Sequence, residues 1–412
     1  MTSDRMDKIL DDISSGKKKL YSLDSELGSE KATDVRRAFL ERESSSSLDA
    51  IGSGSMDFAR VCGKNAENTI GVAQIPMGVA GPLTVRGEYA DATYYVPLAT
   101  TEGALIASTN RGCSVISGAG GAVSRVTGDS MTRAPLFKVP DIASGMELVR
   151  WVESNFDEIR DVSDSQTRYT KLSSCVPYIV GRNVFLRFAF STGDSMAMNS
   201  ATKASDAIAQ LIEERFSWAS LVSVSGNMCV DKKASATNLV LGRGKSVAAE
   251  ALIPKDMVSS KLKTTAERMA DVCYRKIYVG SARAGALGGF NAHVANIAAA
   301  FFAATGQDLA HVVEAAAAFT TFEVADDGDL YAAVTLPDVP LATFGAGTSL
   351  PTQSEALSIL GLLGSGKNPG DNCRALAEIF AGVVLAGELS LIGALASRDL
   401  TRAHMALGRS KK

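Results

Sequence analysis

The segment PLFKVPDIASGMELVRWV, residues 135–152, opens a stretch in which the hydrophobic pattern alternates between strand and helix periods. Across residues 135–224 the pattern predicts, in order, strand 135–140, helix 141–159, strand 168–180, strand 184–190, helix 196–216 and strand 220–224. A β-α-β-β-α-β order is that of the ferredoxin-like arrangement. The sequence therefore predicts a small ferredoxin-like domain over residues 135–223, inserted into a larger domain.

The chain on either side of this insert is rich in Gly, Ala and Val. Before the insert, a strand pattern over residues 84–96 is followed by a helix that opens near Thr101. After it, apolar patterns predict helices at 292–305, 309–319, 353–363 and 375–396. We expect an α+β protein with a large α/β domain that contains a long central helix, and a small helical N-terminal arm. The large domain would comprise residues 50–134 and 224–412, and the arm residues 1–49.

The composition excludes several classes of protein. The 412-residue chain is 46% hydrophobic with a formal net charge of −3, so it can bury a large core but has no broad charged surface for nucleic acid or membrane. Its six cysteines include no CxxC pair, which disfavours a zinc site or a disulfide scaffold and favours the reducing cytoplasm. No metal is expected. The apolar run 379–396 contains Glu388 and is predicted to be a buried core helix, and the charged N-terminus lacks a secretory signal.

The motif TTEGALIASTNRGC, residues 100–113, places several polar side chains around the start of a predicted helix. On spacing alone, Glu102 is more often a first-turn carboxylate that complements the helix dipole than a catalytic acid. Ser108, Asn110 and Arg111 offer a hydroxyl, an amide and a guanidinium, which could hold a phosphate or simply face solvent.

Two further motifs lie at the second half of the insert and directly after it. TGDSMAMNSATK, residues 192–203, is at a strand-to-helix junction, where free N–H groups can bind phosphate. Spacing alone favours a simple helix cap by Thr192 or Asp194. SGNMCVDKKASATN, residues 225–238, is a predicted loop in which Lys232 beside an aspartate could be aimed at a developing oxyanion, although adjacent lysines are usually solvated.

The C-terminal half holds the remaining polar candidates. His293 and Asn296 are predicted to share one helix face. Asp308 follows Gly306 and is, by sequence, first of all the N-cap of the next helix. His404 lies near the end of a predicted helix, where a histidine is commonly only a partner of the helix dipole.

One segment imitates a nucleotide-binding loop. GLLGSGKN, residues 361–368, nearly fits the phosphate-binding pattern GxxxxGK[ST], but Asn368 stands where a hydroxyl must reach magnesium, and the segment follows a helix. The glycine-rich stretches 118–121 and 285–289 also lack the Rossmann spacing. A nucleotide triphosphatase is therefore disfavoured, and a dinucleotide would bind through another fold.

Taken together and in this order, over roughly residues 60–410, the motifs closely resemble class I 3-hydroxy-3-methylglutaryl-coenzyme A reductases. The resemblance implies a soluble, archaeal-like enzyme that reduces (S)-3-hydroxy-3-methylglutaryl-CoA to mevalonate with two NADPH, in isoprenoid biosynthesis. It also implies that the ferredoxin-like domain binds the cofactor, and that a homodimer or homotetramer holds active sites between its subunits. The alternatives are an NAD-dependent, degradative oxidation of mevalonate and a catalytically inactive acyl-CoA-binding homologue.

By this resemblance the catalytic groups are Glu102, Lys232, Asp308 and His404. Lys232 would hold the oxyanion that each hydride transfer creates, and Glu102 would donate protons with a pKa tuned by Asp308. His404 would protonate the departing coenzyme A thiolate, and its place on a C-terminal segment suggests a flap that closes over substrate.

The resemblance also implies the binding residues. The substrate contacts would be Arg133, Ser225, Lys233, Lys276, Asn296, Ser108, Asn110, Arg111 and Tyr21. The cofactor contacts would be Arg168, Asp194, Met196, Met198, Asn199, Gly306, Gly345, Gly347 and Arg409. The guanidinium groups of Arg168 and Arg409 suit the 2′-phosphate and favour NADPH over NADH. The chain departs from the family pattern at Ala197, Ala346 and Gly408, where two glycines and an asparagine are usual.

Overall fold

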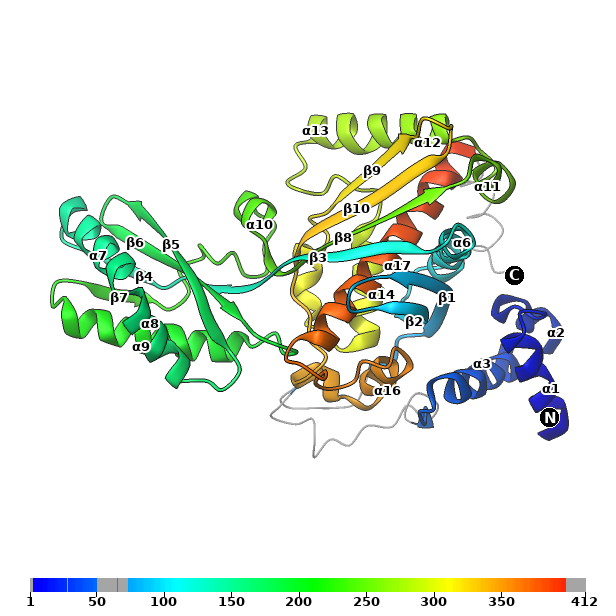
Figure 1. The fold of residues 1–412 in the computed structure, drawn as a ribbon, viewed down its shortest axis with the longest axis horizontal. Coiled ribbons are helices and arrows are strands. Elements are labelled where there is room, and N and C mark those ends of the chain that lie inside the picture. The colour runs from blue at the N-terminus through cyan, green and yellow to red at the C-terminus, as the bar shows by residue number, and fades with distance from the viewer. Residues whose placement is uncertain (1–2, 28, 50–64, 66–72, 398–412) are drawn as a thin grey trace.

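The computed structural model describes residues 3–27, 29–49, 65 and 73–397, and Figure 1 shows them as three units. A large unit lies in the middle, a small unit extends from it on one side, and a helical arm lies on the other. The first elements of the large unit are β1 (Met77–Arg86), β2 (Asp91–Ala99), α6 (Leu105–Gly118) and β3 (Ala122–Arg133). Its later elements are α10 (Ala236–Leu241), β8 (Arg243–Ile253), α11 (Lys255–Met257), η2 (Val258–Leu262), α12 (Ala266–Val272), η3 (Cys273–Gly280), α13 (Ser281–Ala284), α14 (Val294–Thr305), η4 (Leu309–His311), α15 (Val312–Ala315), β9 (Phe319–Val324), β10 (Leu330–Val339), η5 (Ala346–Ser349), α16 (Pro351–Ile359) and α17 (Asp371–Ser397).

The small unit has its own sheet and its own core. Its elements are β4 (Leu136–Lys138), α7 (Ile142–Ser154), α8 (Phe156–Ser165), β5 (Lys171–Val180), β6 (Asn183–Ser191), α9 (Met198–Arg215) and β7 (Ser220–Ser223). The strands lie in the order β7-β4-β6-β5 with every neighbouring pair antiparallel. Phe137, Leu186 and Ile208 from this sheet and its helices are fully buried in one cluster. The insert predicted from sequence thus has a separate hydrophobic core.

The single helix predicted over residues 141–159 is wrong, because the chain forms two helices there. α7 ends at Ser154, and the next residue, Asn155, has a non-helical backbone and a side-chain amide that donates to the Trp151 carbonyl at 2.8 Å. An asparagine side chain that bonds the backbone locally competes with helix continuation. α8 then continues to Ser165, beyond the predicted end.

The N-terminal residues are helical and attached to the large unit. They form α1 (Ser3–Ser14), η1 (Leu20–Ser22), α2 (Leu23–Leu27) and α3 (Ser29–Ser44). Leu23, Val35 and Phe39 are fully buried, and the Phe39 ring meets Tyr95 of β2 edge to face at 5.4 Å between centroids. The helices therefore share a core and dock through it onto β2.

β3 joins the two larger units. Its first part pairs with β8 from Val123 to Ser130, and its last three residues, Met131 to Arg133, pair with β6 of the small unit. One strand therefore belongs to both sheets, as Figure 1 shows. Arg133, at the end of this strand, lies at the junction between the units.

The large sheet was only partly predicted from sequence. β3, β8, β10 and β9 lie side by side and are antiparallel, and none of these four strands was predicted. The helix predicted over residues 309–319 is wrong in its second half, because α15 ends at Ala315 and β9 begins at Phe319. Asn291 donates its side-chain amide to the carbonyls of Ala316 and Ala318, which holds the chain out of the helix.

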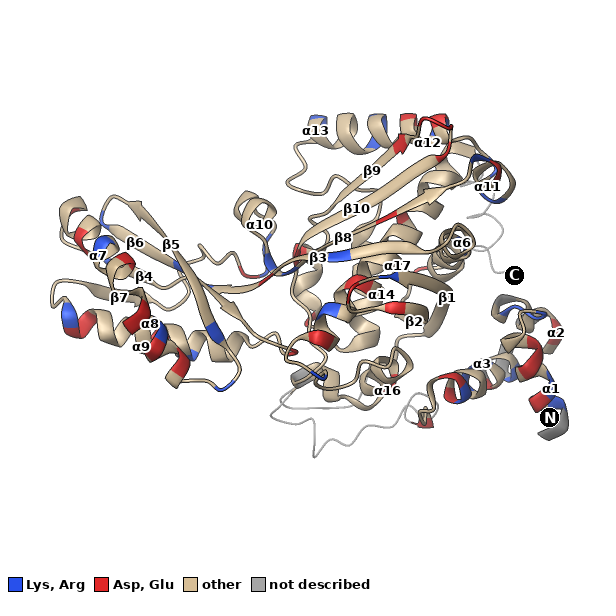
Figure 2. Cartoon of the chain, in the orientation of Figure 1, with Lys and Arg blue, Asp and Glu red and all other residues tan. Residues whose placement is uncertain are grey.

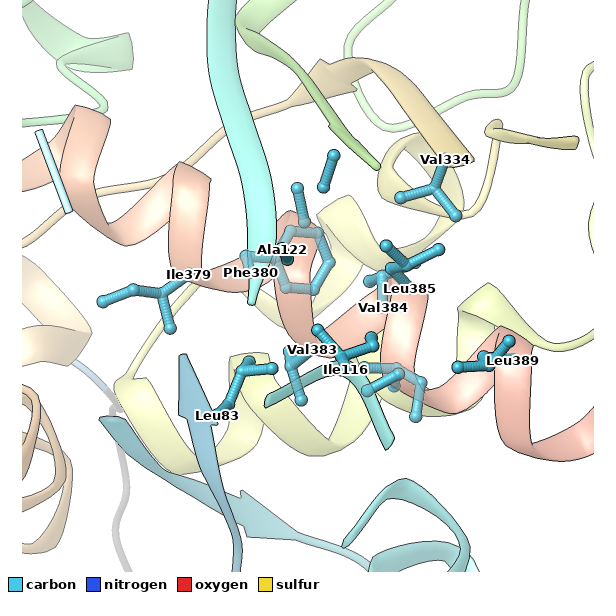
Figure 3. Close-up of a cluster of buried hydrophobic side chains, with 14 of the residues drawn as sticks. Leu83, Ile116, Ala122, Val334, Ile379, Phe380, Val383, Val384, Leu385 and Leu389 are labelled. Atoms are coloured by element: carbon cyan, nitrogen blue, oxygen red, sulfur yellow. The ribbon is translucent and has the colours of Figure 1, made fainter. Parts of the chain in front are cut away.

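α17 is the core helix of the large unit. Among the described residues it is the one helix that is long and apolar enough to cross a membrane, yet 89% of its most apolar window is buried within the protein. Figure 3 shows Phe380, Val384 and Leu385 of α17 packed close to Leu83 of β1 and Ile116 of α6. The predicted buried core helix at residues 375–396 is confirmed.

Two glutamates on α17 are buried and hold other parts of the fold. Glu378 accepts the backbone N–H groups of Glu88, Tyr89 and Ala90 at 2.8–3.0 Å. This fixes the turn between β1 and β2, where the sequence pattern had suggested a single strand over residues 84–96. Glu388 accepts the N–H groups of Ala292 and His293 and the hydroxyl of Thr320. Each buried charge is thus balanced by several donors, as burial requires.

The loop after the small unit is fixed by buried polar side chains on β10 and α10. Asn238 of α10 donates to the carboxyl of Asp338 at 2.7 Å and to the carbonyl of Val230 at 3.1 Å. Asp338 is 2% exposed, and its burial, with the nearby negative charge of Glu314, raises its pKa to about 8. This carboxyl group is therefore largely neutral at neutral pH.

We expect Gly112→Ala to destabilise the protein by about 1–3 kcal/mol, because a Cβ at Gly112 of α6 would overlap the backbone of Ala386 in α17. Gly118→Ala is the matched control in the same helix, since a Cβ there meets only the flexible side chain of Met257. The control should change stability by less than about 1 kcal/mol. Urea unfolding of both variants makes the comparison, and equal midpoints would contradict this packing.

We expect Asp338→Asn to remove a pH dependence of stability. An unfolded aspartate ionises near pH ~4 whereas Asp338 ionises near pH 8 when folded, so the unfolded chain releases a proton that the folded chain keeps. The wild-type stability should therefore fall relative to the variant as pH rises from 5 to 8. Urea midpoints of both proteins at several pH values test this, and parallel curves would show that Asp338 ionises normally.

Candidate active site

Lys232 and Asp308 form an ion pair that solvent reaches. The Lys232 ammonium lies 2.8 Å from Asp308 Oδ2, with 44% and 36% of the two side chains exposed. Asp308 also accepts the Ala310 N–H at 3.1 Å as the N-cap of η4, so the predicted cap is confirmed. Burial raises the pKa of Asp308, but the hydrogen bond from Lys232, the Ala310 N–H and the charge of His311 hold it below its usual value.

A buried cluster of charged residues lies beneath this pair. Arg243 of β8 donates to Asp231 at 2.9 Å and to Glu314 at 2.7 Å, and both Arg243 and Glu314 are fully buried. The His311 Nδ1 lies 2.9 Å from Glu314, and its Nε2 lies 3.6 Å from Asp308. Figure 2 shows positive and negative segments close together below α10, where β3 leaves the large unit.

Sequence reasoning missed Arg243, His311 and Glu314. A signal was present, since His311 and Glu314 follow Asp308 at the spacing of one helix face inside an otherwise apolar segment. Asp231, His311 and Glu314 also lie close enough to hold a metal ion. The guanidinium of Arg243 already bonds both carboxylates of this trio, so we interpret the cluster as neutralised by arginine.

Several predicted substrate-binding residues surround the ion pair. Arg133, at the end of β3, donates to the Ser225 hydroxyl at 3.0 Å and lies 4.0 Å from Asp231 Oδ2. Lys233 is exposed and donates to the Asp231 carbonyl. The structure thus brings the end of β3, the loop that carries Lys232 and the start of η4 to one place.

Other predicted residues lie elsewhere. Glu102 is exposed in the turn before α6, and within the described chain no hydrogen bond or ion pair joins it to Lys232 or Asp308. Lys276 is exposed on η3. Asn296 lies next to His293, 3.4 Å from its Nδ1, so the predicted shared helix face brings the two together at the start of α14.

The polar residues on α6 that were predicted to bind coenzyme A hold α6 in place. The Ser108 hydroxyl lies 2.9 Å from that of Ser390 on α17, and Arg111 donates to the same hydroxyl and to the Ser390 carbonyl. Asn110 accepts the N–H of Gly81 in β1. These side chains therefore connect α6 to its neighbours in the core.

Asp194 caps a helix far away in the sequence. Its carboxylate accepts the N–H groups of Gly366, Gly370 and Cys373, which lead into α17. The predicted cap of its own helix by Thr192 or Asp194 is wrong, because the residue at the N-cap of α9 is Ala197, and it makes no side-chain cap bond. The backbone N–H of Gly366, within the segment 361–368 that resembles a nucleotide-binding loop, thus donates to an internal carboxylate.

The three segments with predicted cofactor contacts meet at this point. The N–H groups of Thr343 and Phe344 donate to the Asp194 carbonyl. Gly306, in the left-handed conformation after α14, lies directly against Gly347, and a Cβ on either residue would overlap the other's backbone. Neither position can therefore accept a side chain without a shift of the chain.

The start of α9 connects these segments with the charged cluster. Arg243 donates to the Met198 sulfur at 3.2 Å. Ala197, which stands where a glycine is usual, has the left-handed φ of 53° that glycine adopts most easily. Met196 is half-buried and Asn199 is exposed on either side of this start. Arg168 is exposed in the small unit, with its guanidinium 5.1 Å from the Tyr169 ring centroid.

The remaining predicted residues cannot be placed. His404, Gly408 and Arg409 lie outside the described residues, and so do the side chains of Tyr21 and Ala346. Gly345 precedes η5 with a φ of 101°, a conformation that favours glycine.

Solved structures share this fold. A class II 3-hydroxy-3-methylglutaryl-CoA reductase from Streptococcus pneumoniae, bound to NADPH in open conformations, superposes with a TM-score of 0.70. The superposition covers 88% of this chain and 96% of the other, at 19% sequence identity. This similarity establishes the mixed helix and sheet fold.

Sequence comparison is more specific. Residues 32–409 match the family model of hydroxymethylglutaryl-coenzyme A reductase. The 3-hydroxy-3-methylglutaryl-coenzyme A reductase of Pyrococcus horikoshii is 50% identical over 407 residues, 98% of each chain, and that of Methanothermobacter thermautotrophicus is 51% identical over 402 residues, 97% of this chain and 99% of the relative. A Dictyostelium discoideum reductase is 42% identical over 98% of this chain and 74% of its own length. The chain belongs to the hydroxymethylglutaryl-coenzyme A reductase family.

Proposed function

We propose that this chain reduces (S)-3-hydroxy-3-methylglutaryl-CoA to mevalonate and free coenzyme A with two NADPH, as a step of isoprenoid biosynthesis. The observation that carries the proposal is the Lys232–Asp308 ion pair, in a chain about half identical to reductases of this name over nearly its whole length. A fixed ammonium beside a carboxylate is the group that oxyanion chemistry requires.

The reaction consists of two reductions at one carbon. NADPH supplies the hydrides. The first addition turns the thioester into a hemithioacetal, whose collapse releases the thiolate and leaves an aldehyde; the second gives the alcohol. Lys232 would hold the carbonyl oxygen as negative charge develops on it, and Asp308 would hold the ammonium in place. Glu102 would protonate the product oxygen, and His404 the departing thiolate.

The residues around α9 fit a nicotinamide dinucleotide. α9 is 18 residues long and has no side-chain cap, so its first N–H groups are available to a phosphate. Gly345, Gly306 and Gly347 keep the adjacent backbone free of side chains. The exposed Arg168 would pair with the 2′-phosphate that distinguishes NADPH.

We also propose that the small unit is a ferredoxin-like cofactor domain. Two observations support this: the all-antiparallel strand order β7-β4-β6-β5, and the helix start of α9 directed to the junction that holds Asp194. In this division, residues 135–223 form the cofactor domain, residues 50–134 and 224–412 form the substrate domain with a C-terminal flap, and residues 1–49 form the arm.

The active site would be completed between two copies of the chain, in a homodimer or homotetramer. Within the described part of one chain, no hydrogen bond or ion pair joins Glu102 to Lys232 or Asp308. Close to the site, α10 leaves two adjacent apolar side chains exposed to solvent, Val240 at 81% and Leu241 at 46%. A second copy would cover these residues and supply the missing acid.

A soluble, cytoplasmic enzyme fits the burial of α17.

The proposal is tested by adding 3-hydroxy-3-methylglutaryl-CoA to the purified protein with NADPH or NADH. We expect loss of NADPH absorbance with two cofactor molecules oxidised for each free thiol released. A clear preference for NADH would indicate the degradative enzyme instead. No reaction in either direction would indicate an acyl-CoA-binding homologue.

We expect Lys232→Ala to lower kcat by about 10²-fold or more with little change in substrate binding, because the ammonium acts on charge that develops in the transition state. Lys171→Ala is the matched control: Lys171 also lies near an aspartate, Asp164, at 3.4 Å and with similar exposure, on the small unit. Steady-state kinetics and thioester binding are measured on both. Near wild-type turnover in Lys232→Ala would refute the oxyanion role.

A further inference from the structure

Glu314 is a buried carboxylate with no part in the reaction described so far. It lies on α15, is fully buried, and has several polar partners. Its Oε2 accepts Arg243 at 2.7 Å and lies 2.9 Å from His311 Nδ1. Its Oε1 accepts the backbone N–H of Lys232. A buried carboxylate directed at the main chain of the proposed oxyanion-binding lysine suggests a role in placing that lysine.

The main chain of Lys232 needs such support. Its φ is +58°, in the left-handed region that residues with a Cβ rarely adopt, and Val230 nearby has a φ of +47°. Such conformations persist only where the surroundings hold them. One short segment of the chain holds Lys232. In it, Asp308 forms an ion pair with the Lys232 ammonium, and Glu314 accepts the Lys232 backbone N–H. Both ends of the lysine are therefore attached to residues 308–315.

Glu314 is also connected, through Arg243, to the residue that precedes Lys232. Arg243 bridges Glu314 and Asp231, and Asp231 directly precedes Lys232. Loss of the Glu314 charge would leave Arg243 with Asp231 as its remaining carboxylate partner and the Lys232 N–H without an acceptor. The His311 ring, held by Glu314 through Nδ1, has its buried Nε2 without a hydrogen bond and facing Asp308 at 3.6 Å.

We infer that Glu314 is a positioning residue, which holds Lys232 in the left-handed conformation that carries its ammonium to Asp308. The inference rests on the proposed role of Lys232 in turnover. Glu314 does not reach the substrate in this scheme; it acts through the main chain of Lys232 and through Arg243.

The variant that tests this is Glu314→Asp, which keeps the negative charge but withdraws it by one methylene. Its control is Glu378→Asp, the same chemical change at a glutamate that is also fully buried and accepts three backbone N–H groups, at the β1–β2 turn. We expect Glu314→Asp to lower kcat at least tenfold, with KM for the thioester and for NADPH within about twofold. Glu378→Asp should leave kcat unchanged even if its melting temperature falls as much.

A second measurement does not depend on activity. Amine acylation followed by mass spectrometry gives the labelling rate of Lys232 relative to exposed Lys233 in the same peptide. Release of Lys232 from Asp308 should raise this ratio severalfold in Glu314→Asp and leave it unchanged in Glu378→Asp. If Glu314→Asp folds poorly, Glu314→Gln, which keeps the shape of the side chain, is measured in the same way.

The outcomes separate the two proposals. If Lys232→Ala keeps its turnover, the proposed role of Lys232 fails, and the positioning role fails with it. If Lys232→Ala is inactive but Glu314→Asp matches Glu378→Asp in both kcat and labelling ratio, only the positioning role of Glu314 is overturned.

Discussion

The structure depends on the burial of α17 at the centre of the large unit. A 27-residue apolar helix can lie inside a protein only if the sheet and helices around it cover it completely, and if its own polar groups are satisfied. Glu378 and Glu388 meet the second requirement by accepting backbone N–H groups from the β1–β2 turn and from the chain before α14. The helix therefore fixes the segments that carry α6 and α14 as well as filling the core.

In the candidate site, too, buried carboxylates are satisfied, here by the guanidinium of a buried arginine. Beneath Lys232 and Asp308, which solvent reaches, Arg243 neutralises Asp231 and Glu314 in the interior. A buried arginine between two carboxylates is a rigid arrangement because each lost contact leaves an uncompensated charge. The exposed Lys232–Asp308 pair therefore lies on a group of charged residues that cannot easily rearrange.

Much of the fold could be predicted from the sequence. The elements of the small unit follow from alternation and helical periodicity, and the burial of α17 from an apolar run broken by one acid. The break at Asn155 and the start of β9 at Phe319 could not be predicted, because both depend on side-chain amides that bond particular carbonyls. β8 and β10 were missed because apolar side chains, such as Leu252 of β8 and Ala333 of β10, also occupy the more exposed face, so the sequence lacks a clear alternation.

The candidate site, too, could be predicted only in part from the sequence. Motif order was sufficient to select Lys232 and Asp308, whose pairing the structure shows. Asp194 was selected as a nucleotide contact, yet its carboxylate caps α17 by accepting the N–H of Cys373, which lies 179 positions later in the sequence. Glu314 was missed although it follows Asp308 at helical spacing, because its importance arises from a backbone N–H that comes close only in the folded chain.

The shared strand β3 has a mechanical consequence. Because it is hydrogen bonded to β8 along one part and to β6 at its end, the small unit is not suspended on a flexible linker. We expect the small unit to move relative to the large unit mainly by a twist along this strand. Arg133 lies at the end of β3 that pairs with β6, so a rotation of the small unit would also move the guanidinium that bonds Ser225 beside the ion pair.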